Sequence, residues 1–324
     1  MPELPEVHTT ATILDKLIKG LVIRDVWSGY NSVFHNGKSN IKNLKYFGEF
    51  KKVVTGKKIK DVTRRGKNVL VNLSGNITVL IHMKMTGHLL YGKYGRANAP
   101  SSPRRGSRAD RLDFRFHGND RREEWEAIED GPLKDPFNRF IRLVFTLSNG
   151  KHLAFSDMRK FAKVCYLPTD TLSLSTDLAH LGPEPLEKNF QFTVFNFQLK
   201  KRLNGKIKQV LMDQSLIAGI GNIYSDEALW IAGIHPLRPV RNIKEIEMKK
   251  LFVAAKTVLK KGIDFQGDSM SDYRNPYGEP GKFQTKHHAY RKTGKHCEKK
   301  GCMGTIRRMI VGGRSAHFCD THQK

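Results

Sequence analysis

Hydrophobic residues recur along the chain with two different periods, and the change of period divides it into segments. Residues 2–21 carry apolar side chains at helical spacing from Val7 to Ile18, followed by Gly20 as a stop, which predicts one amphipathic helix. Between residues 21 and 91, short apolar runs separated by turn residues predict antiparallel β-strands. The strand pattern resumes at residue 140 and ends near Pro168, so this part is predicted to form a β-sandwich or flattened barrel.

The second half of the chain follows a helical period instead. Apolar positions recur at helical spacing over 192–203, 206–216, 225–234 and 243–262, which predicts an α-helical domain. Between the second and third of these stretches, the two glycines of AGIGNIY permit a tight turn. A helix beginning beside Asn222 would offer free backbone N–H groups to a phosphate, although a plain loop between helices explains the same residues.

Residues 92–136 interrupt the strand pattern. They are rich in Arg, Gly, Ser and Pro at first and become acidic through EEWEAIED, which is typical of an insertion or a long loop. A group of arginines in this stretch either adds affinity for an anionic partner or is simply solvated, as charge runs usually are. They are Arg104, Arg105, Arg108, Arg111, Arg115, Arg121 and Arg122.

The charge of the chain indicates the class of its partner. Lys and Arg number 57 against 31 Asp and Glu, a formal net charge of +26. Such an excess implies a polyanion such as nucleic acid, because neutralising phosphates releases condensed counterions. The chain has no run of about 20 apolar residues, and MPELPEVHTT lacks the basic and then apolar segments of a signal peptide. We therefore expect a soluble, intracellular protein that does not contact a membrane.

The end of the chain carries a candidate metal site. Three of the four cysteines fall within the last 28 residues, which does not resemble a disulfide framework. Four side chains form two close pairs on either side of a short hairpin: Cys297, Cys302, Cys319 and His322. This spacing predicts one structural zinc ion in a closed site of three cysteines and one histidine. His296 and His317 stand beside cysteines and are the alternative ligands, but neither completes the paired spacing.

Seven segments occur in the order found in the formamidopyrimidine-DNA glycosylase family, the Fpg/Nei group, which the sequence resembles nearly end to end outside residues 92–136. They are MPELPEV, RRGK, HMKMTG, DMRKFA, LMDQSLIAGIGNIYSDEAL, SDYRNPYGEPGKFQ and GRSAHFCDTHQ. Any one of them is modest evidence, whereas all seven in order are very specific. HMKMTG and the SDYR loop resemble the oxidised-purine branch more than the endonuclease VIII-like branch.

The resemblance implies an α+β multidomain fold. An N-terminal β-sandwich with an N-terminal helix is expected over residues 1–170, a helical helix-two-turn-helix DNA-binding domain over 185–290, and a β-hairpin zinc finger over 291–324. The implied function is that of a bifunctional DNA glycosylase and abasic-site lyase of base-excision repair. Its implied partner is double-stranded DNA that contains oxidised purines or abasic sites, on which it acts as a monomer in the bacterial cytoplasm, at the nucleoid.

Two other functions are alternatives. One is an endonuclease VIII-like glycosylase for oxidised pyrimidines. The other is a non-catalytic, zinc-containing protein that binds damaged DNA.

The resemblance also implies catalytic residues. The nucleophile would be the amine of Pro2 after Met1 is removed, since an N-terminal amine has a pKa of about 7.7 to 8.0 and can form a Schiff base with the deoxyribose. Glu3 would donate a proton to open the sugar ring, and Glu6 would support the site through hydrogen bonds. Lys67 would serve β-elimination and Arg314 δ-elimination, both gripping phosphate. From the residues alone, PELPEV also fits an ordinary helix start, and Lys67 an exposed hairpin lysine.

A base inside a duplex is unreachable, so an enzyme of this kind extrudes it and fills the gap with wedge side chains. By resemblance the wedge maps onto Met85, Arg159 and Phe161; without it, the Met and Phe fit a core and the Arg a surface. Lys208 and Asn222 match phosphate contacts around the helical turn. The loop over about 267–284 would cover the flipped base.

The sequence departs from the family pattern at a few positions. His322 replaces the usual last cysteine ligand, and the first cysteine pair is more widely spaced than usual. Asn138 to Arg142 replace a motif that usually carries a histidine, which puts one backbone contact in doubt. His8 stands where a glutamate is common.

Overall fold

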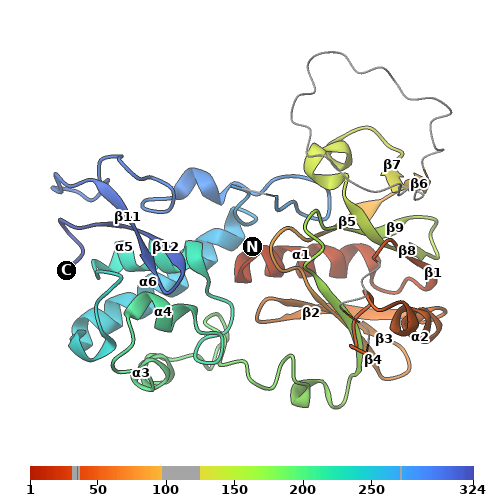
Figure 1. Ribbon diagram of the computed structural model, residues 1–324, viewed down its shortest axis with the longest axis horizontal. Helices are drawn as coiled ribbons and strands as arrows, with labels where there is room; N and C mark the ends of the chain where they lie inside the picture. The colour runs from red at the N-terminus through yellow and green to blue at the C-terminus, as the bar shows by residue number, and fades with distance from the viewer. Residues whose placement is uncertain (31–34, 36, 97–124, 271) are drawn as a thin grey trace.

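The computed structural model describes residues 1–30, 35, 37–96, 125–270 and 272–324. Figure 1 shows two lobes, one built mainly of strands and one mainly of helices, with the N-terminus lying between them. The arginines of the predicted insertion, between Arg104 and Arg122, lie outside the described residues.

Two four-stranded antiparallel sheets form the first lobe. The first sheet has the order β1 (Ile23–Ser28), β8 (Ile141–Leu147), β9 (His152–Ser156) and β5 (His88–Gly92). The second has the order β10 (Lys163–Pro168), β4 (Ile77–His82), β3 (Asn68–Leu73) and β2 (Ile59–Arg65). Gly150 lies between β8 and β9 with φ 76°, the backbone that their hairpin turn requires. The predicted β-sandwich is confirmed.

The N-terminal helix α1 (Leu4–Ile18) completes the core of this lobe. Its apolar stripe, Val7, Ala11, Leu14 and Ile18, is buried in one cluster with the inward-facing residues of both sheets. The helix predicted over this stretch therefore forms, with Pro2 and Glu3 just ahead of its first turn.

A second helix in this lobe, α2 (Leu44–Val54), was not expected, because only strands were predicted between residues 21 and 91. The side chain of Asn43 caps it by accepting from the backbone N–H groups of Lys45 and Tyr46. Only Phe50 and Val54 of this helix are buried. Two anchors are too few to produce a clear helical period in the sequence.

The ends of the predicted insertion are ordered against the sandwich. Strands β6 (Tyr94–Arg96) and β7 (Trp125–Ala127) pair with each other, and the short 3-10 helices η2 (Pro132–Lys134) and η3 (Pro136–Asn138) follow. Tyr94 and Trp125 pack in a small apolar cluster on the outer face of the first sheet.

The second lobe is helical, as predicted. Its helices are α3 (Phe192–Lys200), α4 (Ile207–Met212), α5 (Asn222–Ala232) and α6 (Glu245–Asp264), with 3-10 turns η4 (Leu172–Leu174), η5 (Val240–Asn242) and η6 (Phe283–Lys286) around them. The four helices share one apolar core, which also receives Leu4 of α1. None of the helices among the described residues is long and apolar enough to span a membrane.

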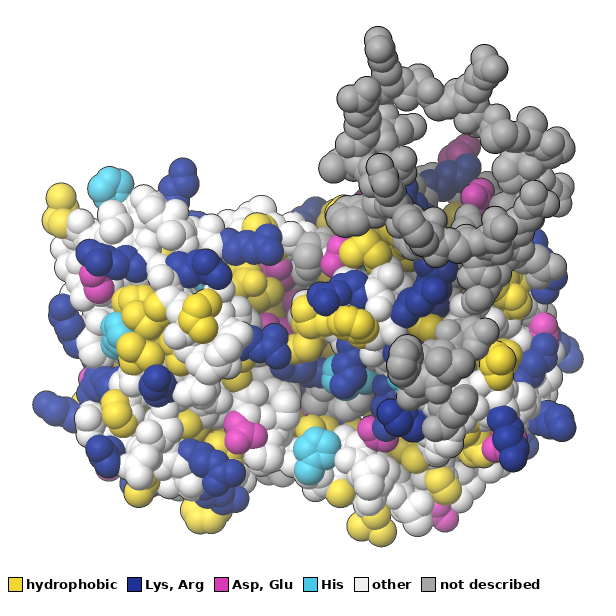
Figure 2. Space-filling model, viewed as in Figure 1, with side chains coloured by type: hydrophobic (Ala, Val, Ile, Leu, Met, Phe, Trp, Pro, Cys, Tyr) yellow, Lys and Arg dark blue, Asp and Glu magenta, His cyan; other side chains and the backbone are white. Residues whose placement is uncertain are grey.

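A two-stranded hairpin ends the chain. It consists of β11 (Ile306–Val311) and β12 (Arg314–Cys319), and β12 packs on α5. Lys and Arg side chains are scattered over both lobes on the face shown in Figure 2, where acidic side chains are few.

Candidate active site

The first residues of the chain are held between the two lobes. The backbone N–H of Leu4 donates to the carbonyl of Gly219 (3.0 Å), and both Pro2 and Glu3 are buried. A Cβ at Gly219, where φ is +105°, would lie 2.6 Å from Leu4, and one at Gly221 would lie 2.4 Å from the Glu3 carboxyl carbon. The two glycines of the AGIGNIY turn therefore make room for the N-terminus.

The carboxylate of Glu3 caps helix α5. Its Oε1 accepts from the backbone N–H of Ile223 (2.9 Å) and its Oε2 from that of Tyr224 (3.5 Å). Gly221, the N-cap residue of α5, has no side chain that could do so. Two of the backbone donors expected to meet a phosphate beside Asn222 are thus already paired with a carboxylate, which the helix dipole favours at this end.

Glu6 is 1% exposed and has a hydrogen-bond donor at each oxygen. The Tyr224 hydroxyl (2.6 Å) and the Asp268 N–H (2.7 Å) donate to Oε1, and the Glu3 N–H (2.7 Å) donates to Oε2. Burial and the nearby charge of Glu3 raise the pKa of Glu6 to about 7, although these hydrogen bonds oppose the shift. Glu6 therefore exchanges a proton near neutral pH.

Lys67 lies in the turn between β2 and β3, and its side chain points inward. The side chain is buried, and its Nζ donates to the carbonyl of Ile220 (2.9 Å), so the interpretation as an exposed hairpin lysine is wrong. Burial lowers the pKa of Lys67; the charges of Glu3 and Glu6 raise it, and that of Arg314 lowers it. These groups thus share one electrostatic environment.

Glu184 fixes the hairpin that carries Lys67. This buried carboxylate accepts from the Gly66 N–H (2.6 Å) and from Arg65 Nη1 (3.1 Å), and it pairs with Arg64 Nη2 (2.5 Å). Arg65 also donates to the carbonyls of residues 181 and 182 (3.0 and 2.8 Å). The two arginines of RRGK therefore anchor the hairpin to the segment that joins the lobes.

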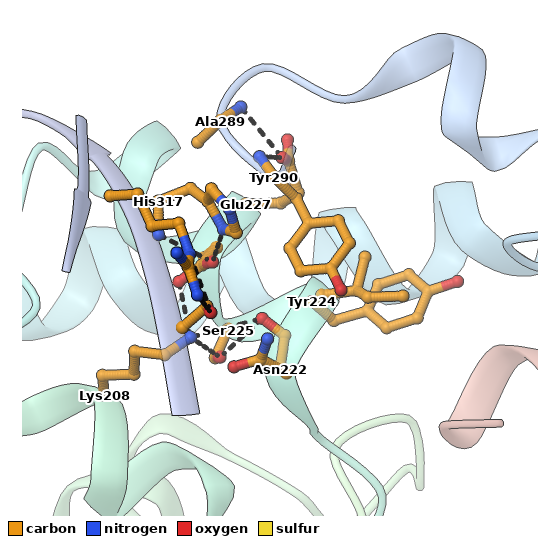
Figure 3. A network of polar contacts seen from close by, with 12 residues as sticks. Lys208, Asn222, Tyr224, Ser225, Glu227, Ala289, Tyr290 and His317 are labelled. Atoms are coloured by element: carbon orange, nitrogen blue, oxygen red, sulfur yellow. Dashed lines mark hydrogen bonds and ion pairs between the residues drawn. The ribbon is translucent and has the colours of Figure 1, made fainter. Parts of the chain in front are cut away.

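Lys208 lies in a closed polar network, shown in Figure 3. It is fully buried, and its Nζ contacts Asp226 Oδ1 (2.5 Å), Ser225 Oγ (3.2 Å) and the carbonyl of Asn222 (3.3 Å). Asp226 Oδ2 accepts from the backbone N–H of His317 (2.9 Å). A direct contact between Lys208 and a phosphate, as expected from the sequence, would require this ion pair to open.

Helix α5, which carries Asp226, also holds the segment around residues 288–290 that leads to the β11–β12 hairpin. Glu227 accepts from three consecutive backbone N–H groups, those of His288, Ala289 and Tyr290, at 2.8, 2.9 and 2.8 Å (Figure 3). Asn222, at the start of α5, has a buried side-chain oxygen with no hydrogen-bond partner among the described residues. This oxygen accepts hydrogen bonds, so a phosphate near Asn222 would have to accept from the NH2 group of the side chain instead.

The three candidate wedge residues lie on two loops joined by Thr86. Its hydroxyl donates to Asp157 (2.8 Å) and accepts from the backbone N–H of Arg159 (3.1 Å), which places the loop of Met85 beside that of Arg159 and Phe161. The Arg159 guanidinium lies 4.5 Å from the centre of the Phe161 ring, which is 50% exposed. Phe161 is therefore not a core residue.

The four expected zinc ligands come together. The sulfur atoms of Cys297, Cys302 and Cys319 and a ring nitrogen of His322 all lie within 4.8 Å of one another. His322 Nε2 lies 3.0 Å from the carbonyl of Trp230, so its Nδ1 faces the cysteines. This is how a histidine ligand is usually oriented by a second hydrogen bond, and the residues fit one tetrahedral zinc ion. His317 instead pairs with Asp226 (3.1 Å).

Comparison with known proteins gives the family. A family model described as the formamidopyrimidine-DNA glycosylase N-terminal domain matches residues 1–164, and one for the H2TH domain of the same glycosylase matches residues 181–274. The formamidopyrimidine-DNA glycosylase of Pelotomaculum thermopropionicum is 34% identical over 324 residues, which cover 100% of this chain and 99% of the relative. The chain belongs to the formamidopyrimidine-DNA glycosylase family. The formamidopyrimidine-DNA glycosylase of Chloroflexus aggregans is 35% identical, and the match covers 98% of this chain and 97% of the relative.

Solved structures of formamidopyrimidine-DNA glycosylases have the same fold. Lactococcus lactis Fpg in complex with DNA containing an abasic site superimposes with a TM-score of 0.76 and 28% identity, covering 99% of each chain. The complex of the same protein with DNA containing N7-benzyl-Fapy-dG gives a TM-score of 0.76 and covers 100% of each chain.

Four residues that support the candidate site were not predicted: Asp157, Glu184, Tyr224 and Asp226. Each is a buried polar group whose partners come from distant parts of the chain. Only at Asp226 did the sequence contain a pattern, and a weak one, that could have indicated a buried polar residue. Asp226 lies in SDEALW, where three polar residues precede an apolar run in a helix whose buried face includes all of them.

Proposed function

We propose that the chain is a bifunctional DNA glycosylase and abasic-site lyase that removes oxidised purines from duplex DNA. The observation that carries the proposal is the burial of Pro2 between the lobes, in a site that also holds the buried side chains of Glu3, Glu6 and Lys67. Family membership supports the activity, and the net charge of +26 supports a DNA substrate. The expected place of action, on the DNA of a bacterial cytoplasm, follows from the same proposal.

The nucleophile is the secondary amine that Pro2 gains when Met1 is removed. Its lone pair attacks C1′ of the damaged nucleotide, and the bond from C1′ to the base breaks as the base leaves with a proton. Glu3 protonates the ring oxygen, which opens the sugar and leaves an iminium between Pro2 and C1′. Glu6, with a pKa of about 7, takes up a proton next to this site.

Elimination follows because the iminium acidifies the proton on C2′. Water takes up that proton, the electron pair left on C2′ breaks the C3′–oxygen bond, and the 3′ phosphate leaves. Burial lowers the pKa of Lys67, which makes its ammonium a better acid to protonate the departing phosphate oxygen. Arg314 serves the second elimination from the tip of the β11–β12 hairpin. Zinc, when bound to its four ligands, supplies rigidity to this hairpin and no chemistry.

The remaining candidate residues hold the DNA. Met85, Arg159 and Phe161 fill the gap left by the extruded base, and the amide NH2 of Asn222 donates to a backbone phosphate. Lys208 positions Asn222 through the carbonyl contact described above. We assign the three parts of the chain as a catalytic sandwich over 1–170, a DNA-binding helical domain over 185–290 and a zinc finger over 291–324, acting as one monomer.

Borohydride trapping tests the nucleophile. The processed protein is expected to form a covalent complex with a duplex containing 8-oxoguanine when the iminium is reduced. Pro2→Gly and Glu3→Gln should trap far less, whereas Glu49→Gln, an exposed glutamate on α2, should trap normally. Tight binding to an abasic-site analogue without any trapping would instead identify a non-catalytic DNA-binding protein.

Substrate comparison tests the lesion class. Duplexes with 8-oxoguanine opposite cytosine should be cleaved faster than duplexes with thymine glycol. The reverse preference would place the protein with the endonuclease VIII-like glycosylases of oxidised pyrimidines.

A further inference from the structure

A basic cavity lies beside Phe161, and nothing in the proposed chemistry uses it. It has a volume of about 440 Å³ and opens between the segment around residues 35–42 and the start of β10. Its charged or titratable lining residues are His35, Lys38, Lys42, Lys84 and Lys163. Among the residues that the structure describes, no acidic side chain lines it.

Lys42 is the buried cation of this cavity. It is 5% exposed, its Nζ lies 5.7 Å from the centre of the Tyr30 ring, and its ammonium has no hydrogen-bond acceptor in the described parts of the chain. Burial lowers the pKa of Lys42; the charge of Asp157 opposes this and that of Lys84 adds to it. The stem of Lys42 is therefore buried while its ammonium faces the cavity, where no acidic side chain among the described residues meets it, and this favours an anion there.

The nearest acids do not supply that anion. Asp157 is already hydrogen-bonded to the Tyr30 hydroxyl (2.8 Å), to Thr86 (2.8 Å) and to the N–H of Ala162 (3.0 Å). Asp177 lies outside the lining and pairs with Lys163 (2.6 Å). One of the four lysines is therefore paired, and the other three face the single charge of Asp157, so the cavity keeps a net positive charge.

Lys84 carries a second sign of function. Its φ of 54° is a left-handed conformation that residues other than glycine rarely adopt, and its N–H donates to Nδ1 of His82 (3.0 Å). Such backbone strain tends to persist at functional sites. Here it brings a lysine to the wall of the cavity directly before the candidate wedge residue Met85.

We propose that this cavity binds one phosphate of the DNA backbone beside the wedge, with the ammonium of Lys42 as its central donor. The proposal rests on the proposed function, because a duplex penetrated by Arg159 and Phe161 brings backbone phosphates to the flanks of those residues. A phosphodiester supplies the anionic oxygens that Lys38, Lys42 and Lys84 lack. Free phosphate has the same chemistry, so the experiment separates the two sources.

The salt dependence of DNA binding tests the site. Lys42→Met keeps the length of the side chain and removes its charge. For a duplex with an abasic-site analogue, the slope of log K against log salt should fall in magnitude by about 0.9, and affinity at 0.1 M salt should fall roughly eightfold. Lys38→Met changes an exposed position, so it should leave the fold intact and shift the slope in the same direction. An unchanged slope in both variants overturns the proposal.

Lys250→Met is the matched control, since Lys250 is exposed on α6, in the other lobe. Its slope should equal that of the wild type. A fall as large as that of Lys42→Met would mean that any lost charge weakens binding, and would overturn the assignment to the cavity.

Neutral methylphosphonates locate the phosphate. Each phosphate of both strands is replaced in turn by a methylphosphonate. At one position near the lesion, the replacement should weaken binding by the wild type and have no effect on binding by Lys42→Met. In a separate arm, inorganic phosphate is added at constant ionic strength. A rise in melting temperature of the wild type alone, without any methylphosphonate effect, would assign the cavity to free phosphate and overturn the DNA contact. Borohydride trapping of the wild type reports the proposed function independently of Lys42.

Discussion

At the scale of single residues, the site depends on carboxylates that are buried for different reasons. The carboxyl of Glu3 lies at the positive end of α5, where backbone N–H groups donate to it. Glu6 is surrounded by donors and by the charge of Glu3, and burial raises its pKa to about 7. Two acids three residues apart therefore lie in different surroundings: Glu3 at a helix end, and Glu6 buried with a raised pKa.

Glu6 gives the first prediction, on stability against pH. A carboxyl whose pKa is raised by folding stabilises the protein while it is protonated, so this contribution is present below the unfolded value of about 4.5 and is lost as pH rises through about 7. Relative to Glu6→Gln, the wild type should lose roughly 3 kcal/mol of unfolding free energy between pH 4.5 and 8. Urea denaturation at both pH values measures the difference.

Glu49→Gln is the control for that comparison, since this exposed glutamate on α2 should show no such change. The same difference between wild type and Glu6→Gln at both pH values would contradict the raised pKa.

At the scale of elements, strands were easier to predict than the contacts between them. Each strand of the sandwich is a short run of mostly apolar residues, and such a run can be recognised from neighbouring residues alone. Helix α2 buries only Phe50 and Val54, so no such pattern exists there. The ion pair of Lys208 could not be predicted for another reason. A lysine in this sequence position can either bind a phosphate at the surface or pair with a buried carboxylate. Only the fold shows that the Nζ of Lys208 lies 2.5 Å from Asp226 Oδ1.

The hairpin that carries Lys67 gives a prediction at this scale. Glu184→Gln leaves Arg64 and Arg65 without their carboxylate, and breaking a largely buried ion pair should cost on the order of 3 kcal/mol of unfolding free energy. The lyase step should also slow, because the turn is no longer fixed. Urea denaturation and the rate of abasic-site cleavage measure the two effects.

A matched change elsewhere separates this from the loss of any salt bridge. Glu245→Gln breaks a pair with Lys249 on the outside of α6 and should leave both measurements unchanged. Equal effects of the two variants would refute the special role of Glu184.

At the scale of the whole molecule, the lobes are joined through the N-terminus, the Glu184 contacts and the loop over 267–284. Asp268 of that loop donates to Glu6, and Arg274 pairs with Asp135 (3.1 Å) at the base of the predicted insertion. The zinc hairpin is attached in turn by Asp226 and Glu227 of α5. The position of the hairpin is therefore stabilised both by the metal ligands and by the hydrogen bonds to α5.

Metal removal gives the prediction at this scale. A chelator, or Cys297→Ser, should abolish binding to abasic-site DNA because Arg314 loses its rigid support, while the sandwich stays folded on its own core. Native mass spectrometry should show loss of one zinc, and near-ultraviolet circular dichroism should retain the signal of the first lobe. Full DNA affinity without zinc would contradict the role given to the hairpin.

The enclosure of the first residues also has a consequence for synthesis. The backbone and side-chain groups that bind Leu4 and Glu3 belong to residues 219–224, which the ribosome makes after about two thirds of the chain. The N-terminus thus stays accessible to an aminopeptidase during most of translation and is enclosed only afterwards. A chain that folded before Met1 was removed would keep a peptide bond at the nitrogen of Pro2 and could not form the iminium, so we expect competence to depend on trimming before residues 219–224 enclose Pro2 and Glu3.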